Sequence, residues 1–437
     1  MKFSNPNLHL LVLGISAVIF FAVGGARAFR FSHDFVPVYT GAGCLLHGCD
    51  PYDTSQLEQQ FFRQGGRVVD LPSWEIDVPV YPPSTFLVLT PLTLFRYPLA
   101  RLLWFLLNGS LFVFSAVLVL SACPQSHRWL ATTLGSLILA TSGILLVLGQ
   151  PAALAISLVI ISSYLFLRTR YLPLGAFLLM LSLAIKPQIG GLIALYFLAQ
   201  KIYRRYAVVA LVGALALLLF AGVFLKVRPQ SANWTSTLRT NLAATLSPGG
   251  SADPRPANQV AVGDVNLQTL TSIFFAEART FNLVAYAAFL GLVAVWILVV
   301  PRSSMSPEMQ FLALAALSIL SLMPVYHRFY DTRLLLLTLP AVIAVFQRRR
   351  FLGAIIAVLT VLAVISVQYR VQLRLVQHAE WQSIFQHKFL FILLLRQQNL
   401  ELLILFGLYM IAILGIRSSN VREMQSSVYQ PAGQLHH

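Results

Sequence analysis

The sequence predicts an all-α, polytopic membrane protein: one integral domain over residues 1–437 that crosses the bilayer about 11 to 13 times. Hydrophobic residues make up 57% of the chain and charged residues 11%, roughly half the charged share of a soluble domain. Apolar runs of about 20 residues, the length that spans a bilayer, recur between short polar segments. These two observations exclude a soluble enzyme. The formal charge of +16 is explained by basic loops and predicts no nucleic-acid partner.

The first spanning helix is expected over Leu8–Ala26. Lys2, this apolar run and the small residues around Arg27 resemble a secretory signal with its cleavage site. The run exceeds the roughly 7–15 apolar residues of a signal core, and many further spans follow. We therefore expect an uncleaved helix that enters from the cytoplasm.

The distribution of charges predicts which loops face outward. Seven of the fifteen acids lie in one loop, 27–79, and a second acidic loop covers 227–280, whereas Lys201–Arg205 and Arg348–Arg350 form short basic segments. Because basic loops stay in the cytoplasm, the two acidic loops should lie outside. The tail 417–437, expected to be disordered, and the N-terminus should lie inside the cell.

The first outer loop contains an apolar pattern of helical period. Val38, Ala42 and Leu45 recur at this spacing, which predicts an amphipathic helix on the outer membrane surface. Cys44 and Cys49 could pair there, but three cysteines make no disulfide framework. We therefore expect both to be unpaired apolar residues.

Further spans are expected at nine clear apolar runs. These are Leu99–Ser121, Trp129–Leu148, Ala152–Arg168, Tyr206–Phe224, Phe281–Val300, Phe311–Met323, Leu334–Phe346, Phe351–Gln368 and Leu400–Ile416. Two segments remain ambiguous. Tyr81–Phe95 is short, and Tyr171–Gln200 is interrupted at Lys186-Pro187.

Two threadings fit these ambiguous segments. If each crosses once, Gly149-Gln150 is cytoplasmic and Lys186 lies within the bilayer. If Tyr81–Phe95 dips and returns while Tyr171–Gln200 forms two half-length helices, Gly149-Gln150 and Lys186 both face outward with the first acidic loop. We prefer the second threading, because charged groups at membrane depth are tolerated where they line a polar cavity.

Several motifs occur in a fixed order along the chain. They are DFVPVYTGAGCLLHGCDPYD from Asp34, YPP at Tyr81, GQ at Gly149, KPQ at Lys186, NLQTL at Asn266 and PVYHRFYD ending at Asp331. With them the chain resembles glycosyltransferase family 87, polyprenyl-phosphate-dependent enzymes of the GT-C class that include mannosyltransferases. The resemblance implies a GT-C-like helical bundle that transfers a sugar from a lipid phosphate to an acceptor hydroxyl.

The resemblance also implies roles for particular residues. The family's catalytic aspartate maps onto Asp34, and its later tryptophan and paired histidines appear here as Tyr326, His327 and Arg328. From composition alone the favoured interpretation of Asp34 is an N-cap of the helix that follows it, but the neighbouring motifs favour a catalytic carboxylate. We predict Asp34 and His327 as the catalytic residues.

The leaving phosphate requires cations, because its oxygens accept charge-assisted hydrogen bonds. Lys186, His327, Arg328 and Arg333 are the candidates, although Lys186 could merely extend from a helix end to the interface. Asp331 either orients His327 or neutralises Arg328 or Arg333. The remaining predicted substrate-binding residues are Tyr81, Gln150, Gln188 and Asn266.

The expected function is therefore an inverting transfer of a sugar, mannose by family analogy, to a lipid or glycan acceptor hydroxyl. The reaction would take place at the outer face of the cytoplasmic membrane. The expected partners are a polyprenyl-phosphate sugar, the acceptor and membrane lipids, with a monomeric chain and neither cofactor nor metal. The alternative is a transporter or flippase for a lipid-linked sugar, although such proteins tend to show repeated halves.

Overall fold

The computed structural model describes residues 6–71, 76–300, 305–365, 371–375 and 387–428. Within these ranges the chain is helical and has no β-strand, apart from one isolated antiparallel bridge between Asp264 and Arg328. The predicted all-α, polytopic class is confirmed. Eight helices in the described ranges are long and apolar enough to cross a membrane, and five shorter apolar helices accompany them. The number of crossings stays a prediction.

The long helices form where the sequence has its longest apolar runs. Six are single helices: α1 (Pro6–Phe31), α5 (Tyr97–Ala122), α8 (Pro151–Arg168), α11 (Arg204–Lys226), α14 (Ala278–Val299) and α20 (Gln397–Val428). Two spans are composite. One joins η3 (Gln125–His127), α6 (Arg128–Thr141) and α7 (Ile144–Leu148), and the other joins η6 (Phe329–Thr338) to α16 (Leu339–Arg348). The shorter α15 (Pro307–Leu320) and α17 (Arg350–Val364) pack beside them.

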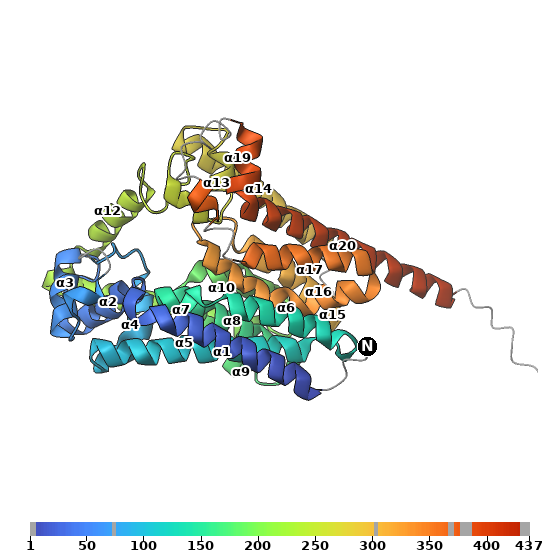
Figure 1. Cartoon of the computed structure of the whole chain (residues 1–437), viewed down its shortest axis with the longest axis horizontal. Coiled ribbons are helices and arrows are strands. Elements are labelled where there is room, and N and C mark those ends of the chain that lie inside the picture. Colours follow the sequence, from blue (N-terminus) through green and yellow to red (C-terminus); the bar gives the residue numbers. More distant parts are fainter. Residues whose placement is uncertain (1–5, 72–75, 301–304, 366–370, 376–386, 429–437) are drawn as a thin grey trace, which may run out of the picture.

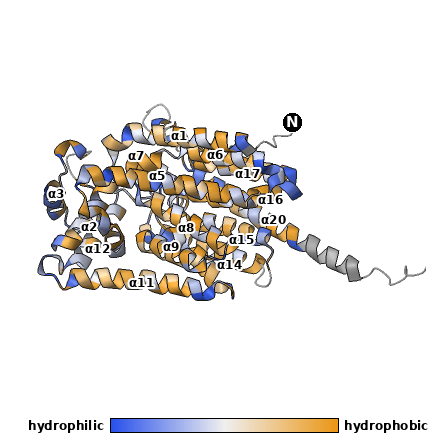
Figure 2. Ribbon diagram, turned by 90° about the horizontal axis from the view of Figure 1, so that it is seen from below, coloured by the Kyte–Doolittle hydropathy of each residue, from blue (hydrophilic) through white to orange (hydrophobic). Residues whose placement is uncertain are grey.

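The centre of the bundle consists of α8 and the composite span η6–α16. Of the residues in their apolar windows, 83% and 94% are buried, against 6% for α14. Figure 2 shows α11 and α14 at the rim, with apolar residues along their length. Exposed apolar helices of this length are stable only in lipid, so these two helices form part of the lipid-facing surface.

Successive long helices along the chain run in opposite directions, which gives the bundle two ends (Figure 1). At one end Arg168 donates to the carbonyl of Ala122 at 2.9 Å, and Arg348 pairs with Glu308 at 2.8 Å. We call it the basic end. At the other end the backbone N–H of Asp34 donates to the carbonyl of Leu148 at 3.1 Å. We call this the loop end.

The segment after the first acidic loop dips and returns at the loop end. It forms α4 (Pro83–Leu89) and η2 (Thr90–Leu94), both too short to span. Thr85 bonds to the carbonyl of Ile185 at 2.9 Å, and Tyr39 bonds to that of Phe95 at 2.7 Å. Both ends of the dip are therefore held at the loop end, in agreement with the preferred threading.

The interrupted segment forms a hairpin of two half-length helices, α9 (Leu172–Ile185) and α10 (Pro187–Ala199). Gly190 on α10 faces Ser182 and Leu183 on α9, so α10 runs back along α9. The ring of Phe197 then meets Phe166, near the basic end of α8, at 4.5 Å. A single crossing by this segment is excluded, and Lys186 lies at the tip of the hairpin.

The first acidic loop contains a helix where one was expected, but its surroundings differ. In α2 (Phe35–His47) every residue from Phe35 to Leu45 is buried, because α3 (Thr54–Arg63) and α4 pack over it. The prediction of a surface helix is wrong for α2. The amphipathic helix of this loop is α3, which buries Leu57 and Phe61 and exposes its polar side.

Cys44 and Cys49 form a disulfide, which corrects the expectation that they are unpaired. Helix α2 ends at Gly48, whose φ of 91° is left-handed, and the N–H of Gly48 bonds to the carbonyl of Cys44. Glycine adopts this conformation without strain. The chain reversal at Gly48 brings Cys49 back beside Cys44 in the last turn of α2. The two cysteines can therefore pair although the chain has too few cysteines for a larger disulfide framework.

The second acidic loop carries α12 (Trp234–Leu246), η5 (Gln259–Gly263) and α13 (Gln268–Thr271). In Figure 1 its later part lies beside α19 (Lys388–Leu395). At the opposite end of the chain, α20 continues to Val428, so residues 417–428 of the predicted disordered tail are helical. The rest of that tail lies outside the described residues.

Candidate functional site

The Asp331 carboxylate is the centre of a buried polar cluster at the loop end. Lys186 reaches it from the α9–α10 tip, with Nζ 2.7 and 2.9 Å from its two oxygens. His327 Nδ1 lies 2.9 Å away and the backbone N–H of Arg328 donates at 3.2 Å. The carboxylate side chain is fully buried and that of Lys186 is 13% exposed. Asp331 therefore orients His327, as one of the two sequence interpretations proposed, and it also neutralises Lys186.

Asp34 lies where α1 gives way to α2. It occupies the N-cap position of α2, but its side chain makes no capping hydrogen bond. Its carboxylate instead contacts the side chain of Gln150, whose Nε2 also donates to the hydroxyl of Tyr330. Gln150 therefore joins Asp34 to the segment that carries Asp331.

The approach of Gln150 to Asp34 depends on Gly149. This residue has a φ of 66°, and a Cβ there would lie 2.8 Å from that of Phe35. Only glycine fits both the conformation and the close contact. The indole of Trp104 fixes the turn by donating to the carbonyl of Gly149 at 2.8 Å.

The environment of Asp34 favours its protonated form. Burial raises the pKa of Asp34 to about 7, and the nearby carboxylate of Asp77 adds to the rise. The amide of Gln150 and the charges of Arg328 and Lys186 oppose it. A carboxyl group with a pKa near neutrality is suited to take up a proton during a reaction.

Tyr81 extends toward the same group of residues. Burial raises the pKa of Tyr81 well above its ordinary value, and the charges of Asp34 and Asp331 act in the same direction. Its phenol therefore stays neutral. Tyr52 donates to the backbone carbonyl of Tyr81 at 2.7 Å and Asp50 binds Thr237 at 3.0 Å, so the DPYD motif anchors this part of the loop.

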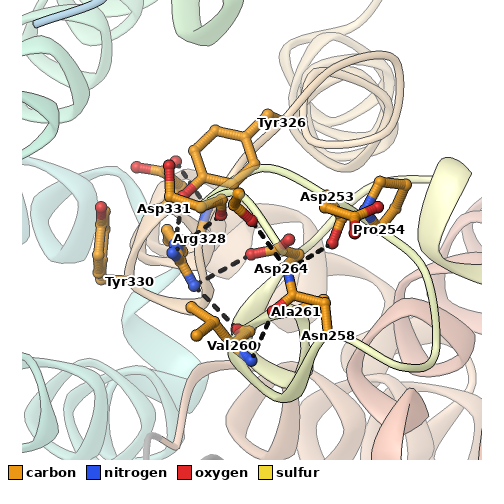
Figure 3. Close-up of polar contacts among 12 residues, drawn as sticks. Asp253, Pro254, Asn258, Val260, Ala261, Asp264, Tyr326, Arg328, Tyr330 and Asp331 are labelled. Atoms are coloured by element: carbon orange, nitrogen blue, oxygen red, sulfur yellow. Dashed lines mark hydrogen bonds and ion pairs between the residues drawn. The ribbon is translucent and has the colours of Figure 1, made fainter. Parts of the chain in front are cut away.

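Arg328 differs from the expectation that it binds phosphate. Its Nε donates to the hydroxyl of Tyr326, and its Nη1 lies 3.1 Å from an Asp264 oxygen and 3.0 Å from the Val260 carbonyl. Its Nη2 donates to the carbonyl of Ser251 at 3.1 Å. Figure 3 shows this guanidinium between Asp264 and Val260. Protein acceptors thus engage all three nitrogens, and Arg328 secures the second acidic loop.

Arg333 interacts with Asp331 through charge, but its hydrogen bonds go elsewhere. Its guanidinium is fully buried and donates to the carbonyls of Phe329 at 2.7 Å and Thr141 at 3.3 Å. The position of Arg333 on η6 directs its side chain toward α6.

Three other predicted residues have different placements. Asn266 is buried and caps the turn of α13 by accepting from the N–H of Thr269 at 2.9 Å. Gln188 follows Lys186 and is half-buried at the hairpin tip. The His327 ring is fully buried, with no exposed surface, so it acts on the site through Asp331.

Sequence reasoning missed three residues of this region: Asp77, Tyr330 and Asp264. Tyr330 and Asp264 stand inside or next to quoted motifs, and a systematic reading of the polar residues flanking each motif would have included them. Asp77 lies outside all the quoted motifs, so no motif singled it out. Groups of three or more His, Cys, Asp or Glu residues that could hold a metal are absent from the described part of the chain.

Three comparisons with known proteins complement this geometry. The sequence model of one family, Glycosyltransferase family 87, matches residues 80–325, which is more than half of the chain. Curated proteins and solved structures gave no match. The matched range contains Tyr81, Gln150 and Lys186, whereas Asp331 lies six residues after it and Asp34 lies 46 residues before it.

Proposed function

Because this chain belongs to glycosyltransferase family 87 and is therefore a glycosyltransferase, we propose that its donor is a polyprenyl-phosphate sugar and its acceptor the hydroxyl of a lipid or glycan. The mannosyl group is the sugar that the family resemblance favours. The chain is also a multi-pass membrane protein by its apolar helices, which suits a donor that never leaves the bilayer.

The observation that carries this proposal is the joining of a base and a cation in one site. Gln150 contacts Asp34 and Tyr330, and the residue after Tyr330 pairs with Lys186. A carboxyl group of near-neutral pKa thus lies beside an ammonium group at the same end of the bundle. Transfer from a lipid phosphate needs both groups: the carboxylate takes the proton of the acceptor hydroxyl, and the ammonium stabilises the oxygen of the leaving phosphate.

In the proposed reaction the acceptor hydroxyl gives its proton to the Asp34 carboxylate. The acceptor oxygen bonds to the anomeric carbon as the bond from that carbon to the phosphate oxygen breaks. The electron pair of the broken bond stays on the phosphate, which leaves with the polyprenyl chain. One displacement by one base implies inversion at the anomeric carbon.

Lys186 is the predicted cation best placed for the leaving phosphate. An ammonium carries three N–H donors, so its contacts with Asp331 leave it capacity for a phosphate oxygen. Asp331 and His327 then serve as positioning residues. Burial lowers the pKa of His327, against the opposing effect of Asp331, which favours a neutral ring that donates through Nδ1.

Charge and the disulfide support one orientation in the membrane. Arg168, Arg204 and Arg348 lie toward the basic end, which the positive-inside rule assigns to the cytoplasm. The Cys44–Cys49 disulfide lies at the loop end, and disulfides persist in oxidising compartments. We propose that the site opens on the periplasmic or extracellular side of the cytoplasmic membrane.

The alternative of a lipid-linked-sugar flippase finds no specific support in the described fold. The two segments that turn back within the described bundle, α4–η2 and α9–α10, lie in the N-terminal half of the chain. Transporters tend to repeat such segments in both halves.

The decisive experiment incubates purified protein in detergent with a panel of radiolabelled polyprenyl-phosphate sugars and a membrane lipid extract. We expect label to move from one donor to an extractable product. Asp34→Asn should lower turnover by about 100-fold or more, the scale for loss of a general base, whereas Asp53→Asn, the same change in the same loop, should not. Transfer by no donor, or equal turnover in both variants, would contradict the proposal.

A second pair of variants tests His327 as a positioning residue. Gln can still donate a hydrogen bond to Asp331, whereas Ala leaves that carboxylate with one fewer buried donor. We expect His327→Gln to retain more donor-dependent activity than His327→Ala. Equal loss in the two variants at equal thermal stability would refute a role through Asp331.

A further inference from the structure

The turn between α19 and α20 lies against the second acidic loop although it is far away in sequence. It contributes Arg396 and Asn399, each 1% exposed. Both residues follow the segment that matches the family, and neither belongs to a motif that the sequence singled out. Two buried polar side chains from a separate part of the chain therefore require an explanation.

Their contacts clamp the loop from 254 to 266. Arg396 donates to the carbonyl of Ala261, and at 3.4 Å to that of Pro254. Asn399 donates to the carbonyl of Asp264 at 3.0 Å and accepts from the N–H of Asn266 at 2.8 Å. The two side chains thus hold four points of the loop.

The same loop holds the catalytic segment from its other side. Val260 and Asp264 bind Arg328, as described above, and the N–H of Val265 donates to the carbonyl of His327 at 2.8 Å. Adjacent carbonyls point in opposite directions: that of Val260 accepts from Arg328 and that of Ala261 accepts from Arg396. Figure 3 shows Val260, Ala261 and Asp264 around Arg328.

We propose that Arg396 and Asn399 are positioning residues for sugar transfer, which act through this loop to hold Arg328 and His327 in place. The inference rests on the proposed function. We call Arg396 and Asn399 the clamp. Both residues lie in the part of the chain that follows the family match. Neither residue touches a reacting atom, and a displaced Arg328 would change the charge that Asp34 experiences.

The charge on Arg328 gives the proposal a readout beyond stability. Four groups from separate segments act on the Asp34 carboxyl: Asp77 from the first loop, Gln150 from the start of α8, Lys186 from the hairpin tip, and Arg328. Arg328 favours the ionised form. Its displacement should therefore move the acidic limb of the activity profile toward higher pH.

The test uses Arg396→Met in the full-length protein, with Arg168→Met as a control for the loss of an arginine–carbonyl contact; Arg168 is exposed, whereas Arg396 is buried. Arg168 also donates to a backbone carbonyl, that of Ala122, and lies over the ring of Phe311 at 5.2 Å, much as Arg396 lies over Phe391 at 5.5 Å. It does so at the basic end. Should Arg396→Met not fold, Arg396→Lys and Asn399→Ala are the milder variants.

The first measurement is hydrogen exchange at the amide of Val265, which needs no substrate. We expect faster exchange in Arg396→Met and no change in Arg168→Met. The second is the pH profile of transfer: kcat should fall by about 10-fold to 100-fold, the scale for displacing a positioning group, and the acidic limb should move upward in the Arg396 variant alone.

The outcomes separate the two proposals. Faster exchange with an unchanged kcat and pH profile overturns the positioning role, as does equal damage in Arg168→Met. Unchanged exchange shows that the clamp does not hold the loop and also overturns it. If the wild-type protein transfers no sugar, the proposed function fails, while exchange at Val265 still decides whether the clamp exists.

Discussion

Replacing Asp34, the proposed base, with Asn should stabilise the protein while it lowers turnover by about 100-fold or more. The pKa of Asp34 rises from 3.8 to about 7 because of burial and the charge of Asp77. The folded state therefore binds this proton more tightly than the unfolded chain does. Stability then falls as pH rises from about 4 to about 7 and stays reduced above it. Asn has no proton to lose, so the variant escapes this penalty.

The magnitude follows from the two pKa values. A rise from 3.8 to about 7 corresponds to a penalty of about 4 kcal/mol above neutral pH, at about 1.4 kcal/mol for each unit of pKa. Asp34 keeps some exposure, and solvent screening reduces the penalty, so we expect a gain of about 1–2 kcal/mol in Asp34→Asn. The Asn side chain still offers an oxygen to Gln150.

The assay is thermal unfolding of both proteins in detergent at about pH 5 and about pH 8. The advantage of Asp34→Asn should be larger at the higher pH. Asp53→Asn is a control in which the pKa shift has the opposite sign. Burial alone would raise the pKa of Asp53, but hydrogen bonds from Ser55 and Gln56 hold it below its ordinary value. An Asp34→Asn variant with no advantage at about pH 8, or with the same advantage at both pH values, would refute this reasoning.

Three further outcomes are expected. Asp77→Asn should move the acidic limb of the activity profile to lower pH, because it removes a negative charge beside Asp34, the proposed base. Glu58→Gln, on the exposed side of α3, should leave the acidic limb in place. Equal shifts in the two variants would contradict the role of Asp34. Lys186→Met should destabilise the protein by about 3–5 kcal/mol, the cost of leaving a buried charge unpaired, whereas unfolding of Lys186→Met combined with Asp331→Leu should show a smaller loss. In intact cells, a cysteine replacing Glu58 in a chain without its native cysteines should react with an impermeant thiol reagent and one replacing Lys201 should not; the reverse pattern would invert the orientation.

The sequence predicted the helical fold, and the end of the bundle at which Gln150 and Lys186 lie, for the same reason. In a bilayer each backbone polar group needs an internal partner, so apolar runs become helices. Interruptions such as Gly149-Gln150 and Lys186-Pro187 must then gather where polar groups are satisfied. These interruptions of the apolar runs therefore indicated the site. Lys186 and Gln150 lie at the same end of the bundle as the first acidic loop, as in the preferred threading.

The partners of the buried charges could not be predicted in this way. Arg328 binds carbonyls of residues 68 and 77 positions away, and their directions depend on turns within an irregular loop. Arg333 points toward α6 because of its place on η6, which residue type does not specify. The burial of α2 likewise depends on which segments cover it, and its own pattern fits a membrane surface equally well.

The hairpin α9–α10 limits how far the reaction centre can rise in the membrane. Its helices have 14 and 13 residues and reach about 20 Å at 1.5 Å per residue, against a hydrocarbon thickness of about 30 Å. Starting from the basic end, the tip with Lys186 stops below the opposite headgroups. A carrier phosphate bound at Lys186, as proposed above, would lie deeper than the phosphates of the surrounding lipids in a bilayer of that thickness. The acyl-chain length of the host membrane should therefore affect turnover, with thin bilayers giving the carrier the shorter descent.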